Sequence, residues 1–290
     1  MSKLNISIQG NLGSYSHIAA NSIFGPFDSA QGDKLELLER SDFTDVFEDL
    51  KEDRADYIVV PFENSTHGSV FQNYDNISKY DFTIIGEVYL RINFHMIVHP
   101  GTKLEDIKTL YSHPVGLNQI REFLHEHKDI KDIEFDDTAG SVKMIKEKGL
   151  KDSAAAAGRL AAEIYGMEIL KENIHENQKN FTRFFVISKA GKQPKELKDL
   201  KHNKTSIQFL LGDEPGSLYK SLRTFADRDI ALTKIESRPI LHTDWEYRFY
   251  VDVMSGIQED KMKNALFELK SYVKELKILG SYEKGKYIET

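Results

Sequence analysis

An apolar stretch in the middle of the chain carries two reactive polar groups at its entrance. Residues 180–187 read Asn-Phe-Thr-Arg-Phe-Phe-Val-Ile, which predicts a buried strand that begins with Thr182 and Arg183. A hydroxyl can donate or accept a hydrogen bond, and a guanidinium can bind an anion. Such residues at a strand start are also commonly solvated or satisfied locally, so this stretch alone leaves a structural and a chemical role open.

A second polar concentration follows the apolar run of residues 55–60. Residues 61–69 read Pro-Phe-Glu-Asn-Ser-Thr-His-Gly-Ser and place carboxylate, amide, hydroxyl and imidazole groups within nine residues. A polar turn explains this segment as well as a binding site does. Shorter polar strand ends recur at residues 112–114 and 137–141.

The elements before these segments predict βαβ units. Residues 4–8 alternate as a strand, a glycine turn covers 10–14, and a helix begins at Tyr15. Asp42 is a predicted N-cap for a helix over 43–50, which leads into the strand at 55–60. Right-handed crossovers would give a parallel sheet that binds ligands beyond the carboxyl ends of its strands. The glycine turn fits either an anion site or a tight turn capped by Ser14.

A second lobe is expected from about residue 82. Strands are predicted at 82–88, 90–98, 109–113 and 133–135, and Ala154 to Tyr165 is predicted to be a helix of small residues. His95 and His99 are four residues apart on an apparent strand, where that spacing forms no ligand face, and the chain has no cysteine. We therefore expect no metal.

The last third of the chain has a different character. Lysine recurs at every third position from Lys189 to Lys204 with interleaved acidic residues, which favours a solvated linker over a nucleic-acid site. Residues 206–279 then follow the order βαββαβ, which predicts a ferredoxin-like sandwich. An ion pair would explain Glu236 and Arg238, whereas a small zwitterion held with residues 212–217 would explain both segments.

Composition and charge indicate which partners and which cellular location to expect. The chain has 290 residues, which favours two domains, and a formal net charge of −7, which argues against nucleic acid or an anionic membrane as the main partner. No apolar run is long enough to span a bilayer, no signal peptide is predicted, and cysteine is absent, so we expect a cytoplasmic location.

Several short segments together resemble one family over nearly the whole chain. They are residues 13–16 (Gly-Ser-Tyr-Ser), 60–65 (Val-Pro-Phe-Glu-Asn-Ser), 68–70, 112–114, 182–184 (Thr-Arg-Phe), 216–219 and 236–239 (Glu-Ser-Arg-Pro). The chain resembles prephenate dehydratase with a C-terminal ACT regulatory domain. The resemblance implies an α/β fold with a two-lobed catalytic domain like type II periplasmic binding proteins (1–188, second lobe about 82–178), a linker (189–203) and a ferredoxin-like α+β ACT domain (204–284).

The resemblance also implies three groups of site residues. The resemblance implies that Thr182 donates to the departing hydroxyl, that Arg183 anchors a carboxylate and that Phe184 forms an apolar wall. The residues implied for catalysis are these three together with Glu63, Asn64 and Ser65. Those implied for substrate binding are Ser14, Tyr15, Gly68, Ser112, His113 and Thr138. Those implied for binding regulatory phenylalanine are Gly216, Ser217, Leu218, Tyr219, Glu236, Ser237, Arg238 and Pro239.

The implied activity is the decarboxylating dehydration of prephenate to phenylpyruvate in phenylalanine biosynthesis, by a lyase without a cofactor. L-phenylalanine would be the allosteric effector, and the chain would form a homodimer or homotetramer. An arogenate dehydratase and a non-catalytic amino-acid sensor are the alternatives. This chain departs from the family pattern at Asn11, Phe94, Glu176 and Ser217, and the last of these could alter effector affinity.

Overall fold

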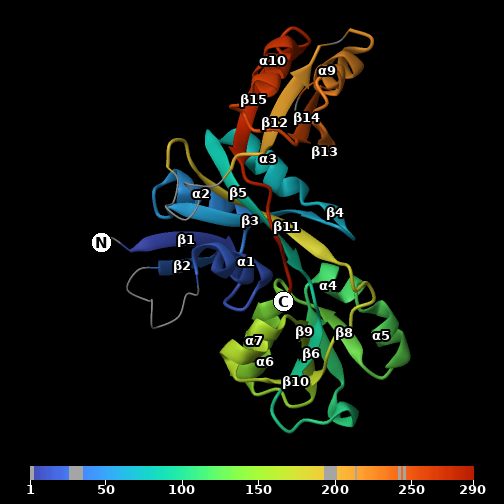
Figure 1. Cartoon of the computed structure of the whole chain (residues 1–290). Helices are drawn as coiled ribbons and strands as arrows, with labels where there is room; N and C mark the ends of the chain where they lie inside the picture. The colour runs from blue at the N-terminus through green and yellow to red at the C-terminus, as the bar shows by residue number, and fades with distance from the viewer. Residues whose placement is uncertain (1–2, 26–34, 193–200, 213, 241–242, 244–245) are drawn as a thin grey trace. The chain divides into compact units, whose positions relative to one another are not determined.

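The computed structural model describes residues 3–25, 35–192, 201–212, 214–240, 243 and 246–290. The chain forms two compact units (Figure 1). Unit 1 comprises Met1–Asp81, Val88–Lys189 and Lys286–Thr290, and unit 2 comprises Phe82–Glu87 and Ala190–Gly285. This division differs from the expected boundaries, because residues 82–87 belong to the second unit and residues 286–290 return to the first.

The first lobe of unit 1 is built on a seven-stranded sheet of order β16-β5-β11-β3-β1-β2, with β4 paired to β3. Its strands are β1 (Leu4–Gln9), β2 (Leu35–Arg40), β3 (Tyr57–Asn64), β4 (Gly68–Ser69), β5 (Phe82–Arg91), β11 (Phe181–Lys189) and β16 (Tyr287–Ile288). The first part of β5, Phe82–Glu87, belongs to unit 2. Its helices are α1 (Tyr15–Phe24), α2 (Phe43–Lys51) and α3 (Phe71–Lys79). β1 pairs in parallel with β2 and β3, but β11 pairs antiparallel with β3, so the predicted parallel sheet is only partly correct.

The second lobe contains a five-stranded sheet of order β10-β6-β9-β7-β8. Its strands are β6 (His95–Val98), β7 (Thr109–Ser112), β8 (Lys131–Glu134), β9 (Ser153–Ala157) and β10 (Glu168–Lys171). Its helices are α4 (Pro114–Asn118), α5 (Arg121–Glu126), α6 (Thr138–Lys148), α7 (Arg159–Tyr165) and the single 3₁₀ turn η1 (Leu104–Asp106).

The alanine-rich stretch shows how burial overrides helix propensity. The prediction of a helix from Ala154 was wrong, because Ser153–Ala157 form the fully buried strand β9 between β6 and β7, and α7 begins only after Gly158. Ala155 and Ala157 pack against α6 and α7 in the core of this lobe. Small side chains here allow both helices to approach the sheet closely, and that packing outweighs the intrinsic preference of alanine for a helix.

The βαββαβ order predicted for the last third is confirmed in unit 2. Strands β12 (Lys204–Leu211), β13 (Leu232–Pro239), β14 (Tyr247–Val253) and β15 (Val273–Tyr282) form an antiparallel sheet of order β13-β14-β12-β15, with helices α9 (Ser217–Ala226) and α10 (Asp260–Leu269). One core contains apolar residues of both helices and the sheet, among them Phe209, Phe225 and Leu269.

The lysine-rich segment is buried at Lys204, whereas its other end, at Lys189, lies at the surface. Lys204 is buried, and its Nζ donates to both oxygens of Glu87 at 2.9 Å, while Lys189 pairs with Asp53 at 2.7 Å. Most of the predicted linker, residues 193–200, lies outside the described residues. Within the described chain, no helix combines the length and apolar character needed to cross a membrane.

Candidate active site

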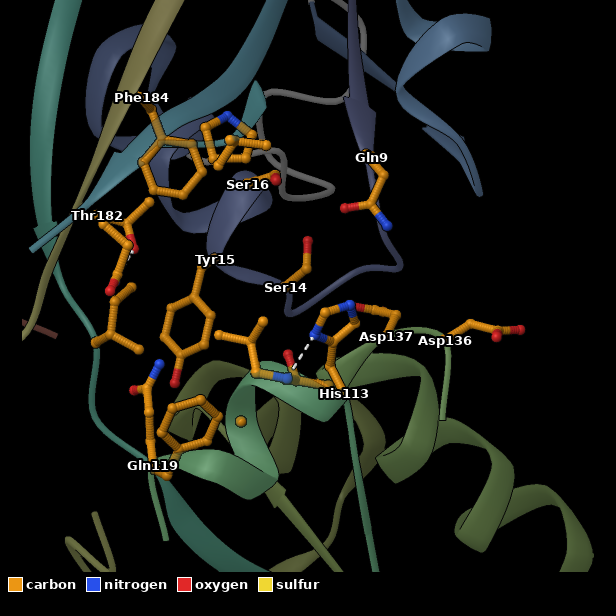
Figure 2. A pocket seen from close by; sticks show the side chains of 18 of the residues that line it. Gln9, Ser14, Tyr15, Ser16, His113, Gln119, Asp136, Asp137, Thr182 and Phe184 are labelled. Atoms are coloured by element: carbon orange, nitrogen blue, oxygen red, sulfur yellow. Dashed lines mark hydrogen bonds between the residues drawn. The ribbon is translucent and has the colours of Figure 1, made fainter. Parts of the chain in front are cut away.

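A cavity of about 280 Å³ lies between the two lobes of unit 1, at the polar ends of their strands. It is lined from the first lobe by Gln9, Ser14, Tyr15, Ser16, Phe43, Pro61, Asn64, Val70, Thr182 and Phe184, from the second by Phe94, His113, Val115, Gly116, Gln119, Asp136, Asp137 and Thr138, and from a segment joining the lobes by Ile92. Figure 2 shows Thr182 and Phe184 on one side and His113 on the opposite side, with Tyr15 between them.

Thr182 is held in the cavity wall by a single amide. Asn64 Nδ2 donates to Thr182 Oγ1 at 2.9 Å, and Asn64 Oδ1 accepts from the backbone N–H groups of Thr66 and His67, both at 2.9 Å. Those two donors fix which end of the Asn64 amide carries oxygen. Thr182 is 9 % exposed, and within the described chain its hydroxyl donates to no other group. Its proton is therefore available for a ligand in the cavity.

The amide of Asn64 belongs to a longer network that reaches the second lobe. Asn64 Nδ2 also donates to Asn180 Oδ1 at 2.8 Å, and Asn180 Nδ2 donates to Gln119 Oε1. Gln119 Nε2 lies 3.2 Å from His67 Nδ1, and burial lowers the pKa of His67, so this ring nitrogen accepts. The network joins residues of both lobes and restricts the rotamers of the groups around Thr182.

His113 forms the opposite wall as the N-cap of α4. Its Nδ1 accepts from the Val115 N–H at 3.2 Å (dashed in Figure 2). Burial lowers the pKa of His113, although Asp137, Asp136 and Glu134 oppose this effect. A neutral ring with an accepting Nδ1 carries its proton on Nε2, which makes His113 a hydrogen-bond donor rather than a cation.

Tyr15 joins the cavity to a segment that connects the lobes. Its hydroxyl donates to the carbonyl of Asn93 at 2.6 Å, and its ring meets Phe94 edge-on with centroids 5.8 Å apart. Burial raises the pKa of Tyr15, so the hydroxyl stays protonated and remains a donor. Tyr15 also lies over Gly158, where an added Cβ would be 3.3 Å from its ring.

The cavity is lined by the N-terminal ends of two helices, α1 and α6. Among the described lining residues none is lysine or arginine. The lining includes Ser14, the N-cap of α1, and the first residues of α1 and α6, Tyr15 and Thr138. The N–H groups of a first helical turn have no intrahelical acceptor by position. The N-terminus of α1 therefore supplies partial positive charge, whereas the Asp137 carboxylate caps the N-terminus of α6. Within the described residues no cluster of His, Cys, Asp and Glu has the grouping of a metal site.

The turn at Gly13, which precedes the N-terminus of α1, packs closely against the second lobe. Gly13, with φ of +87°, lies so near α7 that an added Cβ would be 2.6 Å from the Cα of Ala161. Burial lowers the pKa of His17 to about 4, against an opposing hydrogen bond with Asn21. The Gly13 N–H donates to Nδ1 of this neutral ring at 2.9 Å, which completes the turn.

Seven of the twelve residues expected for catalysis and substrate binding line the cavity. They are Ser14, Tyr15, Asn64, His113, Thr138, Thr182 and Phe184. Ser112 lies behind the wall, where its hydroxyl donates to the carbonyl of Ala156 at 2.7 Å. Ser65 accepts from the Phe181 N–H at 2.9 Å, which anchors the strand before Thr182, and Gly68 is exposed.

Arg183 is not among the residues that line the cavity, and its expected role as carboxylate anchor stays a prediction. Successive side chains of a strand alternate, so Thr182 and Phe184 point into the cavity while Arg183 and Phe185 point away. The guanidinium stacks over Phe185 with 4.3 Å to the ring centroid, and its Nη1 lies 3.7 Å from Glu63. Arg183 is 3 % exposed, so Arg183 and Glu63 support the strand from behind.

Sequence reasoning missed Gln9, Phe94, Gln119 and Asp137 as lining residues. Gln9 ends β1 and was detectable as the last residue of a strand that precedes a glycine turn. Asp137 stood within the polar segment 137–141, but only Thr138 was selected from it. Gln119 and Phe94 carry no local signal, because tertiary packing alone brings them to the cavity.

The segments expected to bind an effector lie in unit 2. Gly216 is the N-cap of α9, Ser217 begins this helix, and Glu236 to Pro239 form the end of β13. Ser217 lines a hollow of about 190 Å³ with Glu214, Lys220 and Tyr272, and none of residues 236–239 contributes to it. Lys234 Nζ lies 3.4 Å from Glu236 Oε2, which is an ion pair within β13.

Comparison with known proteins identifies the family. The model of the prephenate dehydratase family matches residues 6–192. A bifunctional chorismate mutase/prephenate dehydratase from Aquifex aeolicus is 36 % identical over 284 residues, 98 % of this chain and 74 % of that protein. Arogenate dehydratase 2 from Petunia hybrida is 35 % identical over 295 residues, 97 % of this chain and 72 % of that protein.

Two solved structures share the fold over 97 % of the chain. A prephenate dehydratase from Arthrobacter aurescens in complex with L-Phe aligns with a TM-score of 0.84 and 27 % identity, covering 97 % of this chain and 90 % of that one. A structure described as a quorum-quenching acylase, GqqA, aligns with a TM-score of 0.82 and 28 % identity, covering 97 % and 98 %. The fold is that of a two-lobed α/β protein. The chain belongs to the prephenate dehydratase family.

Proposed function

We propose that this chain converts prephenate to phenylpyruvate, carbon dioxide and water, with Thr182 as the donor to the departing ring hydroxyl. The observation that carries this proposal is the Thr182 hydroxyl in the cavity wall, which accepts from Asn64 and keeps its own proton for a ligand. Membership of the prephenate dehydratase family supports the same reaction.

In this reaction the bond from the ring to its carboxylate breaks, and the electron pair enters the ring. The bond from the ring to its hydroxyl breaks at the same time, and the oxygen leaves as water after gaining one proton. Aromatisation supplies the driving force. A threonine hydroxyl is too weak an acid to release a free proton at neutral pH, so Thr182 passes its proton to the departing oxygen only as the carbon–oxygen bond breaks, while Asn64 donates to the Thr182 oxygen. A proton from solvent then restores the Thr182 hydroxyl.

The substrate carboxylates are held by neutral donors in this proposal. The first turns of α1 and α6 offer N–H groups, and Ser14 and the Nε2–H of His113 add side-chain donors. Ile92, Phe94 and Phe184 supply apolar wall around the ring and displace water from the carboxylate that leaves. Arg183, which stacks on Phe185, is not assigned a contact with substrate.

Turnover of prephenate tests the proposal directly. The full chain is mixed with prephenate, and the absorbance of phenylpyruvate is followed, with Thr182→Ala as the control. Product formation by the parent that Thr182→Ala abolishes supports the assignment. Saturable binding of prephenate or of amino acids without product would support the non-catalytic sensor instead.

One observation favours arogenate as a second substrate. Arogenate carries an ammonium group where prephenate has a ketone, and the cavity lining includes Asp136 and Asp137 but, in the described chain, no basic side chain. Asp136 is exposed at the rim. Comparing kcat/KM for both substrates in the parent, in Asp136→Asn and in the control Glu134→Gln tests this. Asp136→Asn is expected to shift the ratio towards prephenate.

Unit 2 is proposed to bind L-phenylalanine as an ACT domain, through residues 216–219 and 236–239. A relative of 27 % identity was solved in complex with L-Phe, and the βαββαβ fold of unit 2 supports the assignment. A cytoplasmic location and a homodimer or homotetramer are part of this proposal. Gel filtration with light scattering measures the oligomer.

A further inference from the structure

The last described residues of the chain return to unit 1 as an edge strand. β16 pairs in parallel with β5, with Tyr287 opposite Tyr89 and Ile288 opposite Leu90. The N–H of Tyr89 donates to the carbonyl of Lys286 at 3.0 Å. β5 would otherwise be the edge of the first sheet, so residues 286–290, here called the terminal strap, cover that edge.

Tyr287 connects the terminal strap to the strand that carries Thr182. Its ring stacks on Tyr89 with centroids 4.8 Å apart at 18°, and it meets Phe181 edge-on at 5.2 Å and 87°. Phe181 directly precedes Thr182, and its carbonyl accepts from the Ser65 N–H at 2.8 Å. Tyr287 is 62 % exposed, so it covers the outer side of these two rings rather than filling a core.

Glu289 and Thr290 hold the other segment that runs between the lobes. Glu289 pairs with Arg91 Nη1 at 2.6 Å, and Arg91 Nη2 donates to the carbonyl of Gln178 at 2.5 Å. Asn93 Nδ2 donates to the Thr290 carbonyl at 2.8 Å, and the Thr290 hydroxyl donates to the Arg91 carbonyl at 3.1 Å.

Asn93 lies next to the cavity. Its carbonyl accepts from the Tyr15 hydroxyl at 2.6 Å, and its neighbours Ile92 and Phe94 line the cavity. The two crossing segments also bind each other, since the Ile92 N–H donates to the Asn180 carbonyl at 2.9 Å. The terminal strap therefore touches both crossings between the lobes, one residue away from Thr182 on one side and one residue away from Phe94 on the other.

We propose that the terminal strap sets the geometry of the active site, with Tyr287 as a positioning residue for Thr182 that acts through Phe181. This inference rests on the proposed dehydratase reaction. Among the described residues, the ring contacts and the side-chain hydrogen bonds and ion pair of the strap go to Tyr89, Arg91, Asn93 and Phe181, none of which lines the cavity. The strap is therefore proposed to contribute to the alignment of the Thr182 hydroxyl with the departing oxygen rather than to substrate affinity. Misplacement of a catalytic group by about 1 Å can lower turnover by about a hundredfold.

Four variants of the full chain test this proposal, and a chain that ends at Gly285 accompanies them. Tyr287→Ala removes the ring, Tyr287→Phe keeps it, and Asn93→Ala removes the amide that binds Thr290 while leaving the Asn93 carbonyl. Phe267→Ala is the matched control, because Phe267 is an aromatic residue of α10 that is 80 % exposed. Each is assayed for kcat and KM with prephenate and for its melting temperature.

Tyr287→Ala and the shortened chain are expected to lose between about tenfold and a hundredfold in kcat, with KM within about threefold of the parent. Tyr287→Phe is expected to keep the kcat of the parent, Asn93→Ala to lower kcat, and Phe267→Ala to leave kcat unchanged. If Tyr287 only stabilised the fold, Tyr287→Ala would instead lower the melting temperature and the fraction of active protein.

An unchanged kcat in Tyr287→Ala and Asn93→Ala, with an active parent, would overturn the positioning role alone. If Tyr287→Ala raises KM and leaves kcat unchanged, the strap acts on binding and the proposal is wrong. An inactive parent would overturn the proposed function, and this inference with it.

Discussion

The carboxylate of Asp137 accepts two hydrogen bonds from Asn11, one from its backbone N–H at 3.0 Å and one from its side-chain amide at 3.1 Å, although 126 residues separate them. The same oxygen accepts from the Gly140 N–H at 2.8 Å as the N-cap of α6. One oxygen thus caps a helix of the second lobe and ties the glycine turn of the first lobe to it, directly beside the cavity.

Asp137→Ala is expected to lower the free energy of unfolding by about 1 to 2 kcal/mol, because it removes the helix cap and the link between the lobes. KM for prephenate should rise, since the first turns of α1 and α6 no longer hold their spacing. Urea unfolding and steady-state kinetics measure the two effects. Asp132→Ala, at an exposed position of β8, is the control, and equal stability of the two variants would contradict the prediction.

Thr182→Ala is expected to keep the fold and to lose turnover, because it removes one hydroxyl from the cavity wall and leaves Asn64 without that acceptor. Thr182→Ser retains the hydroxyl and should keep measurable activity. Circular dichroism checks the fold, and phenylpyruvate formation checks the rate. Activity of Thr182→Ala within a few-fold of the parent would remove Thr182 from the mechanism.

Arg183→Met is expected to act on stability rather than on substrate affinity. The guanidinium stacks on Phe185 and pairs with Glu63 from a buried position, so its loss should lower the free energy of unfolding by about 1 to 3 kcal/mol. KM should stay within about twofold of the parent. A KM raised more than about tenfold at unchanged stability would restore the role of carboxylate anchor.

Stability is expected to fall as the pH drops from about 6.5 to about 4, partly through His17. Burial lowers the pKa of this ring to about 4 in the folded chain, whereas the unfolded chain binds the proton near 6.5. The unfolded state therefore holds more protons within this window, and folding loses roughly 3 kcal/mol across it. Urea unfolding at several pH values should show a shallower dependence for His17→Gln.

His125→Gln, at an exposed position of α5, controls for that experiment and should keep the slope of the parent. Burial also lowers the pKa of His67, His95, His113 and His175, so these residues act with the same sign. A His17 ring that titrates near 6.5 in the folded protein by NMR would contradict the prediction.

Phenylalanine binding to unit 2 is expected to weaken in Glu236→Ala and Arg238→Ala, as measured by calorimetry on the full chain. Coupling between effector and substrate sites is typically worth about 1 to 3 kcal/mol and is reciprocal, so prephenate should weaken phenylalanine binding by the same factor. Lys263→Ala, which removes a surface pair with Asp260 on α10, is the control. Unaltered affinity in both strand variants would place the effector elsewhere.

A chain that ends at Lys192 would contain the catalytic lobes without most of unit 2. Its activity would not by itself show whether phenylalanine acts through unit 2. Such a chain lacks residues 286–290, which belong to unit 1, and leaves residues 82–87 without the rest of unit 2. Loss of activity there would report on missing contacts rather than on the effector site.

Local signals in the sequence were sufficient for much of the fold. The N-cap at Asp42, the βαββαβ order of unit 2 and the strand at 181–187 each depend on neighbouring residues and on hydrophobic period, and each is confirmed. The same period of two, applied to β11, would have separated Thr182 from Arg183, since consecutive strand residues face opposite sides. The assignment of both residues to one site stays a prediction.

Tertiary structure decided what depends on distant partners. Burial between two strands made a strand of the alanines at 154–157, and pairing with Glu87 buried Lys204 in a segment that reads as solvated. The sequence alone named the polar strand ends and, through the family resemblance, Thr182. Only the folded chain placed Asn11 on Asp137 and Tyr287 on Phe181, because the free energy of such contacts comes from packing residues that are more than a hundred positions apart, and no local pattern encodes it.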